Sequence, residues 1–146
     1  GGALSIQNNL ALTDLAGLSG ITSIVGSLTI YQNDALADLD WLSGLLAVGG
    51  AMDISYNSAL ANLGGLSDLT SVGGTLRITD NQVLTSLDGL ASLTTVIDSL
   101  VISDNPLLCF SKVAAFFSSC TDGSAGLMCR PHSSKARRYG RTRSRT

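Results

Sequence analysis

The segment Met52-Asp53-Ile54-Ser55-Tyr56-Asn57 recurs through this chain at a step of 24 residues. Matching segments begin at Leu4, Leu28, Leu76 and Leu100, and they share the frame Leu-x-Ile-x-x-Asn, in which Met52 replaces the leucine once. Self-similarity at a period of about 20–50 residues is typical of a solenoid, whose units cover one another's apolar faces. The repetition therefore predicts a β-solenoid of about five coils, beginning near residues 4, 28, 52, 76 and 100.

Each coil is predicted to contain one short strand followed by tight turns. The alternation Leu-x-Ile favours a strand with both apolar side chains facing inward. Apolar residues then recur at every third position, which suits 3₁₀ or extended turns better than an α-helix. In the third coil these positions are Leu60, Leu63, Leu66, Leu69 and Val72. We expect the coils to close at Gly26, Gly50 and Gly74 through a glycine with positive φ.

One polar column accompanies the apolar ones, with an asparagine three residues after each isoleucine. A carboxamide has both a donor and an acceptor, so it can satisfy backbone groups where a strand bends. Asparagine also tolerates a bent backbone. We interpret the column as a structural ladder between coils and not as a binding site. It consists of Asn9, Asn33, Asn57, Asn81 and Asn105.

The charge distribution divides the chain of 146 residues. Residues 1–129 contain all 11 acidic residues and two basic ones, whereas residues 130–146 contain seven basic residues. This asymmetry predicts a solenoid over residues 1–108, a C-terminal cap over 109–129 and a basic disordered tail over 130–146. The cap would carry Cys109, Cys120 and Cys129, which suit one disulfide and a spare thiol in any of three pairings. We interpret the tail as inert. Nucleic acid, an anionic membrane or the acidic body could alternatively attract it, but we expect no specific nucleic-acid partner.

Catalysis and cofactor binding find little support in the residue types. The chain has one histidine, His132, no glutamate and no nucleophile motif, so no general-base constellation is present. The cysteine spacings fit no zinc pattern, and we expect no metal and no cofactor. Asp80 and Asp104 should stack with like charge, which leaves calcium as an alternative to simple solvation. No apolar run is long enough to cross a bilayer, and no secretory signal is present.

The outward positions of the strands are the better candidate for function. They vary from coil to coil above a constant core, as recognition by a repeat protein requires. Tyrosine and arginine dominate interface energetics, and we expect Asp53 and Arg77 to be neighbours on adjacent coils. The predicted ligand-binding face comprises Thr29, Tyr31, Asp53, Ser55, Tyr56, Arg77 and Thr79.

Two further features have open interpretations. Trp41 occupies a column otherwise filled by glycine, and it either lies over its own loop or marks an exposed adhesive point. Thr22, Thr70 and Thr94 resemble the flat threonine arrays of ice-binding solenoids, although Leu46 interrupts the series.

The repeats resemble the receptor L-domain branch of the leucine-rich repeats, as shown by the two runs 74–81 and 84–96. The resemblance covers about residues 1–108. It implies a right-handed, single-stranded β-helix-like solenoid related to the α/β horseshoe, an extracellular or cell-surface location and recognition of a protein ligand. Leu108-Cys109 is similar to the disulfide-bearing ends of such domains. No furin-like module, membrane span or kinase signature accompanies the repeats, so receptor signalling is not implied.

These observations favour a non-catalytic protein-recognition module that is a fragment of a secreted or cell-surface protein. Gly1-Gly2-Ala3 is in register with Gly49-Gly50-Ala51, so we expect further coils upstream. One alternative is a structural or adhesive solenoid that assembles through its open end. Another is the ectodomain piece of an enzyme-linked receptor. A membrane would be reached only through parts outside this segment.

Overall fold

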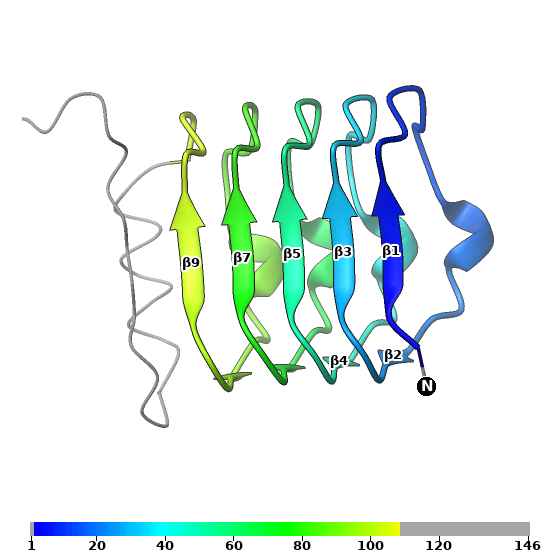
Figure 1. Ribbon diagram of the computed structural model, residues 1–146, viewed down its shortest axis with the longest axis vertical. Coiled ribbons are helices and arrows are strands. Elements are labelled where there is room, and N and C mark those ends of the chain that lie inside the picture. The colour runs from blue at the N-terminus through cyan, green and yellow to red at the C-terminus, as the bar shows by residue number, and fades with distance from the viewer. Residues whose placement is uncertain (1, 109–146) are drawn as a thin grey trace, which may run out of the picture.

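Two parallel β-sheets and four 3₁₀ turns make up the fold in the computed structural model, which describes residues 2–108. The longer strands are β1 (Leu4–Gln7), β3 (Leu28–Tyr31), β5 (Met52–Ser55), β7 (Leu76–Thr79) and β9 (Leu100–Ser103), which form one sheet in that order (Figure 1). The shorter strands are β2 (Ser23–Ile24), β4 (Ala47–Val48), β6 (Ser71–Val72) and β8 (Thr95–Val96), which form the other sheet. The 3₁₀ turns are η1 (Ala16–Leu18), η2 (Asp40–Leu42), η3 (Gly64–Leu66) and η4 (Asp88–Leu90). Residues 2–108 contain no α-helix, and the arrangement is that of a β-solenoid.

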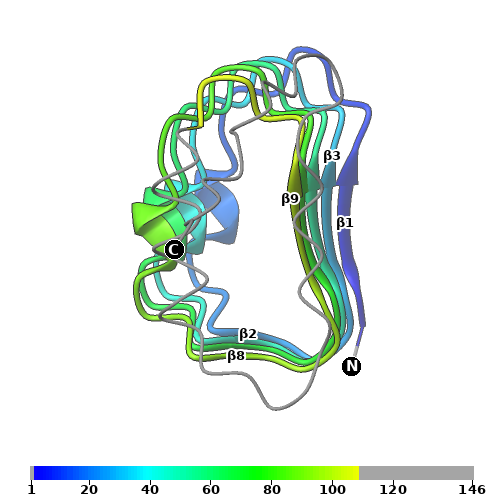
Figure 2. The same cartoon turned by 90° about the vertical axis from the view of Figure 1, so that its left-hand side faces the viewer.

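Each strand pairs with the strand that lies 24 residues further along the chain. Met52 lies opposite Leu76, Ile54 opposite Ile78, and Asp53 opposite Arg77. The same offset holds for the short strands, in which Val48 lies opposite Val72. Figure 2 looks along the stack and shows the coils superimposed, with the long strands on one side and the 3₁₀ turns on the opposite side. Equivalent residues therefore form rows that run from coil to coil.

The apolar rows fill the inside of the stack. Leu60, Leu63, Leu66 and Leu69 are fully buried, as are Met52 and Ile54 on the strand side. In the first coil, by contrast, the corresponding residues are only partly buried: Leu12, Leu15, Leu18 and Ile21. Burial between neighbouring coils, and not within one coil, builds this core.

The glycines at the coil ends differ from the expectation. No glycine among residues 2–108 has a positive φ, so the predicted left-handed turn at Gly26, Gly50 and Gly74 is wrong. A Cβ at Gly26 would lie 2.8 Å from the backbone nitrogen of Ala3, and one at Gly74 would lie 2.8 Å from that of Ala51. These positions exclude a side chain because adjacent coils approach closely there.

The left-handed backbone occurs instead at the residue before each ladder asparagine. These residues, with φ between 52° and 59°, are Asn8, Gln32, Tyr56, Asp80 and Asp104. The bend thus places one non-glycine side chain per coil in the same strained conformation. The expectation that the asparagine itself takes the bent backbone is wrong by one position.

Trp41 belongs to the core, since only 4% of it is exposed. This burial excludes the alternative of an exposed adhesive point. In the third and fourth coils a side chain in this column would clash, because a Cβ at Gly65 would lie 1.8 Å from the carbonyl oxygen of Leu39, and one at Gly89 would lie 1.8 Å from that of Leu63. Backbone hydrogen bonds also join the later coils just before the 3₁₀ turns: the N–H of Ala61 donates to the carbonyl of Ala37, and the N–H of Thr85 donates to that of Ala61. The second coil therefore carries a large buried side chain at the position where the third and fourth coils carry glycine.

A second polar column supports the 3₁₀ turns and was not predicted from the sequence. The side-chain oxygen of Asp38 accepts the backbone N–H of Asp40 at 3.1 Å, just before η2. Asn62 accepts from Gly64 at 2.8 Å in the next coil. Short polar side chains that satisfy a nearby backbone N–H favour such turns. The column consists of Asp14, Asp38, Asn62 and Ser86.

The predicted cap over 109–129, its three cysteines and the predicted tail over 130–146 lie outside the described residues. Within residues 2–108, no helix is long and apolar enough to cross a membrane.

Candidate functional site

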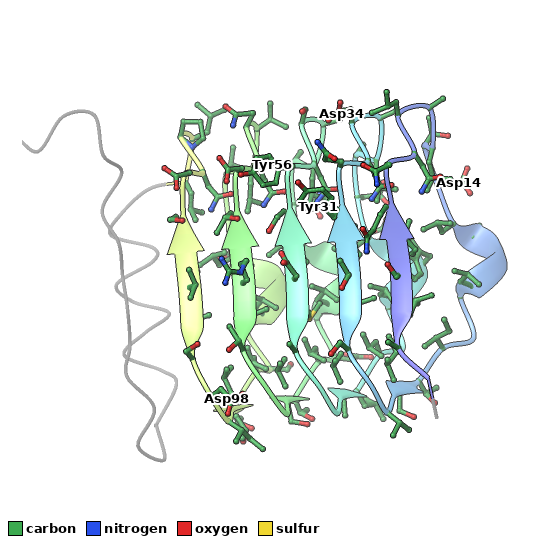
Figure 3. The ribbon with its side chains drawn as sticks, viewed as in Figure 1. Asp14, Tyr31, Asp34, Tyr56 and Asp98 are labelled. Carbon is green, nitrogen blue, oxygen red and sulfur yellow. The ribbon has the colours of Figure 1, made fainter. Side chains whose placement is uncertain are left out.

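A pocket of about 430 Å³ opens where the long strands end, on the outer face of their sheet. Figure 3 shows Tyr31 and Tyr56 at this end of the strands, whereas Asp98 lies at the opposite end. The lining side chains come from successive coils: Tyr31, Asp53, Ser55, Tyr56, Arg77, Thr79, Asp80, Ser103 and Asp104. Because no single coil supplies this set, the pocket exists only when the coils are stacked.

Two tyrosines form the aromatic part of the pocket. Tyr31 is the last residue of β3, and Tyr56 follows β5 directly, in the next coil. Their ring centroids are 5.3 Å apart and the rings are inclined by 65°, an edge-to-face contact. Tyr56 is 45% exposed. The pair therefore presents aromatic surface to solvent while each ring is held in place by the other.

The carboxylate of Asp80 raises the pKa of Tyr56. The two residues occupy the same left-handed position on adjacent coils. The negative charge of Asp80, and then the hydrogen bond that the Tyr56 hydroxyl donates to its carboxylate, raise the pKa of Tyr56 above its ordinary value of 10.0. A phenol beside a carboxylate resists ionisation because two like charges would result. Tyr56 is accordingly a neutral hydrogen-bond donor at physiological pH.

The other wall of the pocket contains a surface ion pair and two hydroxyl groups. Arg77 Nε lies 3.9 Å from Asp53 Oδ2, with both side chains substantially exposed. The Thr79 hydroxyl donates to Ser55 Oγ at 3.0 Å, and the Ser55 hydroxyl donates to Asp53 Oδ1. These bonds orient the Asp53 carboxylate, while the exposed ion pair itself contributes only about 0–1 kcal/mol.

Six of the seven residues predicted for the binding face line this pocket, and the seventh, Thr29, does not. The expectation of open, outward positions is wrong for Ser55 and Thr79, which are only 2% and 7% exposed. Both line the pocket, and they bond to each other while Ser55 also bonds to Asp53. They can shape the pocket and orient its carboxylate, but they offer little surface to a partner.

Three lining residues were not included in the predicted face: Asp80, Ser103 and Asp104. A signal for them was present, because Asp80 and Asp104 follow Tyr56 in its column at 24-residue steps, and Ser103 follows Thr79. The bend at the end of each strand brings that column to the outer face. Asp80 and Asp104 thus contribute to a pocket with aromatic walls.

The asparagines lie beneath this region and connect the coils. Asn57 is fully buried, and its Nδ2 donates to the Ile30 carbonyl at 3.0 Å. Its Oδ1 accepts the backbone N–H of Asn33 at 3.1 Å. The same pattern joins Asn81 to Ile54 and Asn105 to Ile78. The four ladder asparagines after Asn9 are buried, and they position the residues that precede them, including Tyr56 and Asp80.

The alternatives of calcium binding and of a threonine array gain no support in this part of the chain. Among residues 2–108, no three histidine, cysteine, aspartate or glutamate side chains are grouped so that they could hold a metal ion. The Thr70 and Thr94 hydroxyls donate to carbonyl groups of the preceding coil, at 2.9 and 3.1 Å. Those threonines thus serve as links between coils.

Comparison with protein families gives one match, to a family model described as Receptor L domain, over residues 1–119. Comparison with curated proteins and with solved structures gives no match.

Proposed function

Because this chain belongs to the receptor L domain family, we propose that it is a non-catalytic module that recognises a protein ligand. The family consists of ligand-binding modules of receptors and is not a catalytic family. The module would belong to a secreted or cell-surface protein and would function outside the cell. We also propose the finer architecture of a right-handed leucine-rich repeat solenoid of about five coils, which is supported by the 24-residue pairing of the strands.

The observation that carries this proposal is the pocket built from several coils on the outer face of the long strands. It combines two tyrosines with an aspartate and an arginine, and tyrosine and arginine are the side chains most enriched where binding energy concentrates. The two tyrosines restrain each other, and bonded hydroxyls orient the Asp53 carboxylate. Such preorganisation reduces the entropy cost of binding a partner.

A pair of matched variants tests the proposal against a panel of purified extracellular proteins. The face variant combines Tyr31→Ala, Asp53→Asn and Arg77→Ala in the full 146-residue chain. The control variant combines Leu46→Ala, Asp68→Asn and Asp98→Asn, three exposed positions that do not line the pocket. We expect the face variant to bind its partner at least about 30-fold more weakly, the effect of losing about 2 kcal/mol at an interface centre.

The control variant should bind like the wild-type chain, and both variants should unfold at similar temperatures. Equal loss of binding in both variants would reject the strand face as the recognition surface. Full binding by the face variant would reject it as well.

Assembly through an end of the stack is a second candidate function. Among residues 2–108, β1 is the outermost strand of its sheet. The Nδ2 of Asn9 bonds to Gln7 and Asn33, whereas the later ladder asparagines bond to an isoleucine carbonyl. An unpaired strand edge is a template for pairing with another chain. Light scattering over a concentration series tests this function: growth in mass supports assembly, and a constant monomer mass contradicts it.

A further inference from the structure

The charge of the pocket restricts what it can accept. Asp53, Asp80 and Asp104 supply three carboxylates, whereas Arg77 supplies the only guanidinium among the lining residues. Arg77 lies on the side of Asp53, within 3.9 Å of it. The side formed by Asp80 and Asp104 contains carboxylates and the Tyr56 hydroxyl that bonds to Asp80. A negative potential in this half favours a cationic group over an anionic one.

The aromatic part of the pocket favours an organic cation in particular. A guanidinium or ammonium group is attracted to the face of a tyrosine ring, and carboxylates nearby add charge-assisted hydrogen bonds. Tyr31 and Tyr56 both line the pocket together with Asp80 and Asp104. A bare metal ion would gain nothing from the rings, and it would lack a set of three ligands among residues 2–108.

The geometry points to a subsite for a basic side chain: we propose that the pocket bounded by Tyr31, Tyr56, Asp80 and Asp104 receives an arginine or lysine of the protein ligand. This inference rests on the proposed function, since it specifies which side chain of the protein ligand binds in the pocket. The volume of about 430 Å³ is sufficient for one long side chain. The aliphatic stem would contact the tyrosines, and the charged end would meet the carboxylates.

Small probes test the subsite without a known partner. N-acetyl-arginine amide, N-acetyl-lysine amide and the uncharged isostere N-acetyl-citrulline amide are titrated into the isotopically labelled full chain and followed by NMR. We expect the two cations, but not citrulline amide, to shift the signals of Tyr31, Tyr56 and Asp80. The shifts should shrink as salt is added, because partly exposed charges are screened.

Matched variants locate the cation. Asp80→Asn removes one charge from the pocket, and asparagine tolerates the left-handed backbone at this position, so the fold is retained. Asp98→Asn removes the same charge at the opposite end of the strands (Figure 3). Asp80→Asn should weaken binding of arginine amide about fivefold, and so should Tyr31→Leu, which keeps apolar bulk but removes the ring. Asp98→Asn should leave binding unchanged.

Three outcomes overturn the subsite: no shift with either cation, equal shifts with citrulline amide, or equal effects of Asp80→Asn and Asp98→Asn. If neither cation binds but the face variant still loses its binding to the protein ligand, only the subsite is wrong. If the cations bind as expected but the face variant keeps its partner, the pocket does bind basic groups, but the proposed recognition face is wrong, and so is a side chain of the protein ligand as the occupant.

Discussion

The Oδ1 atom of Asn57 accepts the backbone N–H of Asn33, 24 residues earlier, at 3.1 Å. The Nδ2 atom of the same carboxamide donates to the carbonyl of Ile30 at 3.0 Å. One buried side chain thus satisfies two backbone groups of the preceding coil, on either side of Tyr31, and it directly follows Tyr56 at the bend of its own coil. Stability and the geometry of the pocket are therefore coupled through the ladder.

Replacing Asn57 by alanine should destabilise the fold strongly. The change leaves the N–H of Asn33 and the carbonyl of Ile30 without these partners in the interior, at a cost of about 1–3 kcal/mol for each group. We expect the free energy of unfolding to fall by about 3 kcal/mol or more, measured by urea denaturation.

Asn9→Ala is the matched control, because Asn9 is exposed at the edge of the ladder. Asn9→Ala should lower the free energy of unfolding by about 1 kcal/mol or less. Similar values for the two variants would show that the coil-to-coil bonds do not stabilise the stack.

Close approach between coils can be tested at Gly65. A Cβ there would lie 1.8 Å from the Leu39 carbonyl oxygen and 2.2 Å from its carbon, both backbone atoms that cannot rotate away. Gly65→Ala should therefore lower the free energy of unfolding by about 3 kcal/mol or more, at the upper end of overpacking effects. Gly17→Ala, in the same column with nothing within 4 Å, should be neutral or slightly stabilising. Thermal unfolding measures the stability of the two variants. Equal melting temperatures would show that the coils do not approach closely at Gly65.

Ionisation of Tyr56 reports on the aspartates around it. Its pKa is raised chiefly by Asp80, so Asp80→Asn should move the pKa back toward 10.0, whereas Asp98→Asn should not. Phenolate absorbance measures this pKa in a background of Tyr31→Phe and Tyr139→Phe. An unchanged titration curve in Asp80→Asn would show that the two side chains do not interact.

The same shift makes stability depend on pH at alkaline values. Since the folded state raises the pKa of this group, its stabilising contribution is fully present below 10.0 and is lost as the pH rises through the raised value. Asp80→Asn should reduce this alkaline loss of stability, as measured by denaturation at a series of pH values.

The ion pair between Asp53 and Arg77 should matter little for stability. Both side chains are substantially exposed and 3.9 Å separates Arg77 Nε from Asp53 Oδ2, so a double-mutant cycle with Asp53→Asn and Arg77→Ala should give a coupling energy of about 0–1 kcal/mol. A coupling well above that range would mean that the pair is structural, and that its loss in the face variant would disturb the fold.

Much of the architecture could be predicted from the sequence because a fixed step places equivalent residues opposite each other. The pairing of Met52 with Leu76 and of Asp53 with Arg77 follows from counting 24 residues. The backbone at the coil ends could not be predicted in this way. Glycine has two uses, positive φ and close approach, and only coordinates distinguish them at Gly26 and Gly74.

The candidate site was predictable in part for a related reason. Alternation along a strand indicates which side chains face outward, and this identified Tyr31, Asp53 and Arg77. It does not indicate how far neighbouring side chains cover a small residue, so the burial of Ser55 and Thr79 was missed. Nor does it show that the bend after each strand directs Asp80 and Asp104 into the same pocket as Tyr56.

Site-specific photo-crosslinking tests the central claim, that the pocket face contacts a protein ligand, most directly. A benzophenone amino acid is placed at position 56 in the pocket, and separately at position 97, which is exposed but does not line it. After illumination with the extracellular panel, we expect a covalent product from position 56 and none from position 97, with the crosslink on the partner next to an arginine or lysine. Products of equal yield from both positions, or from position 97 alone, would contradict the account.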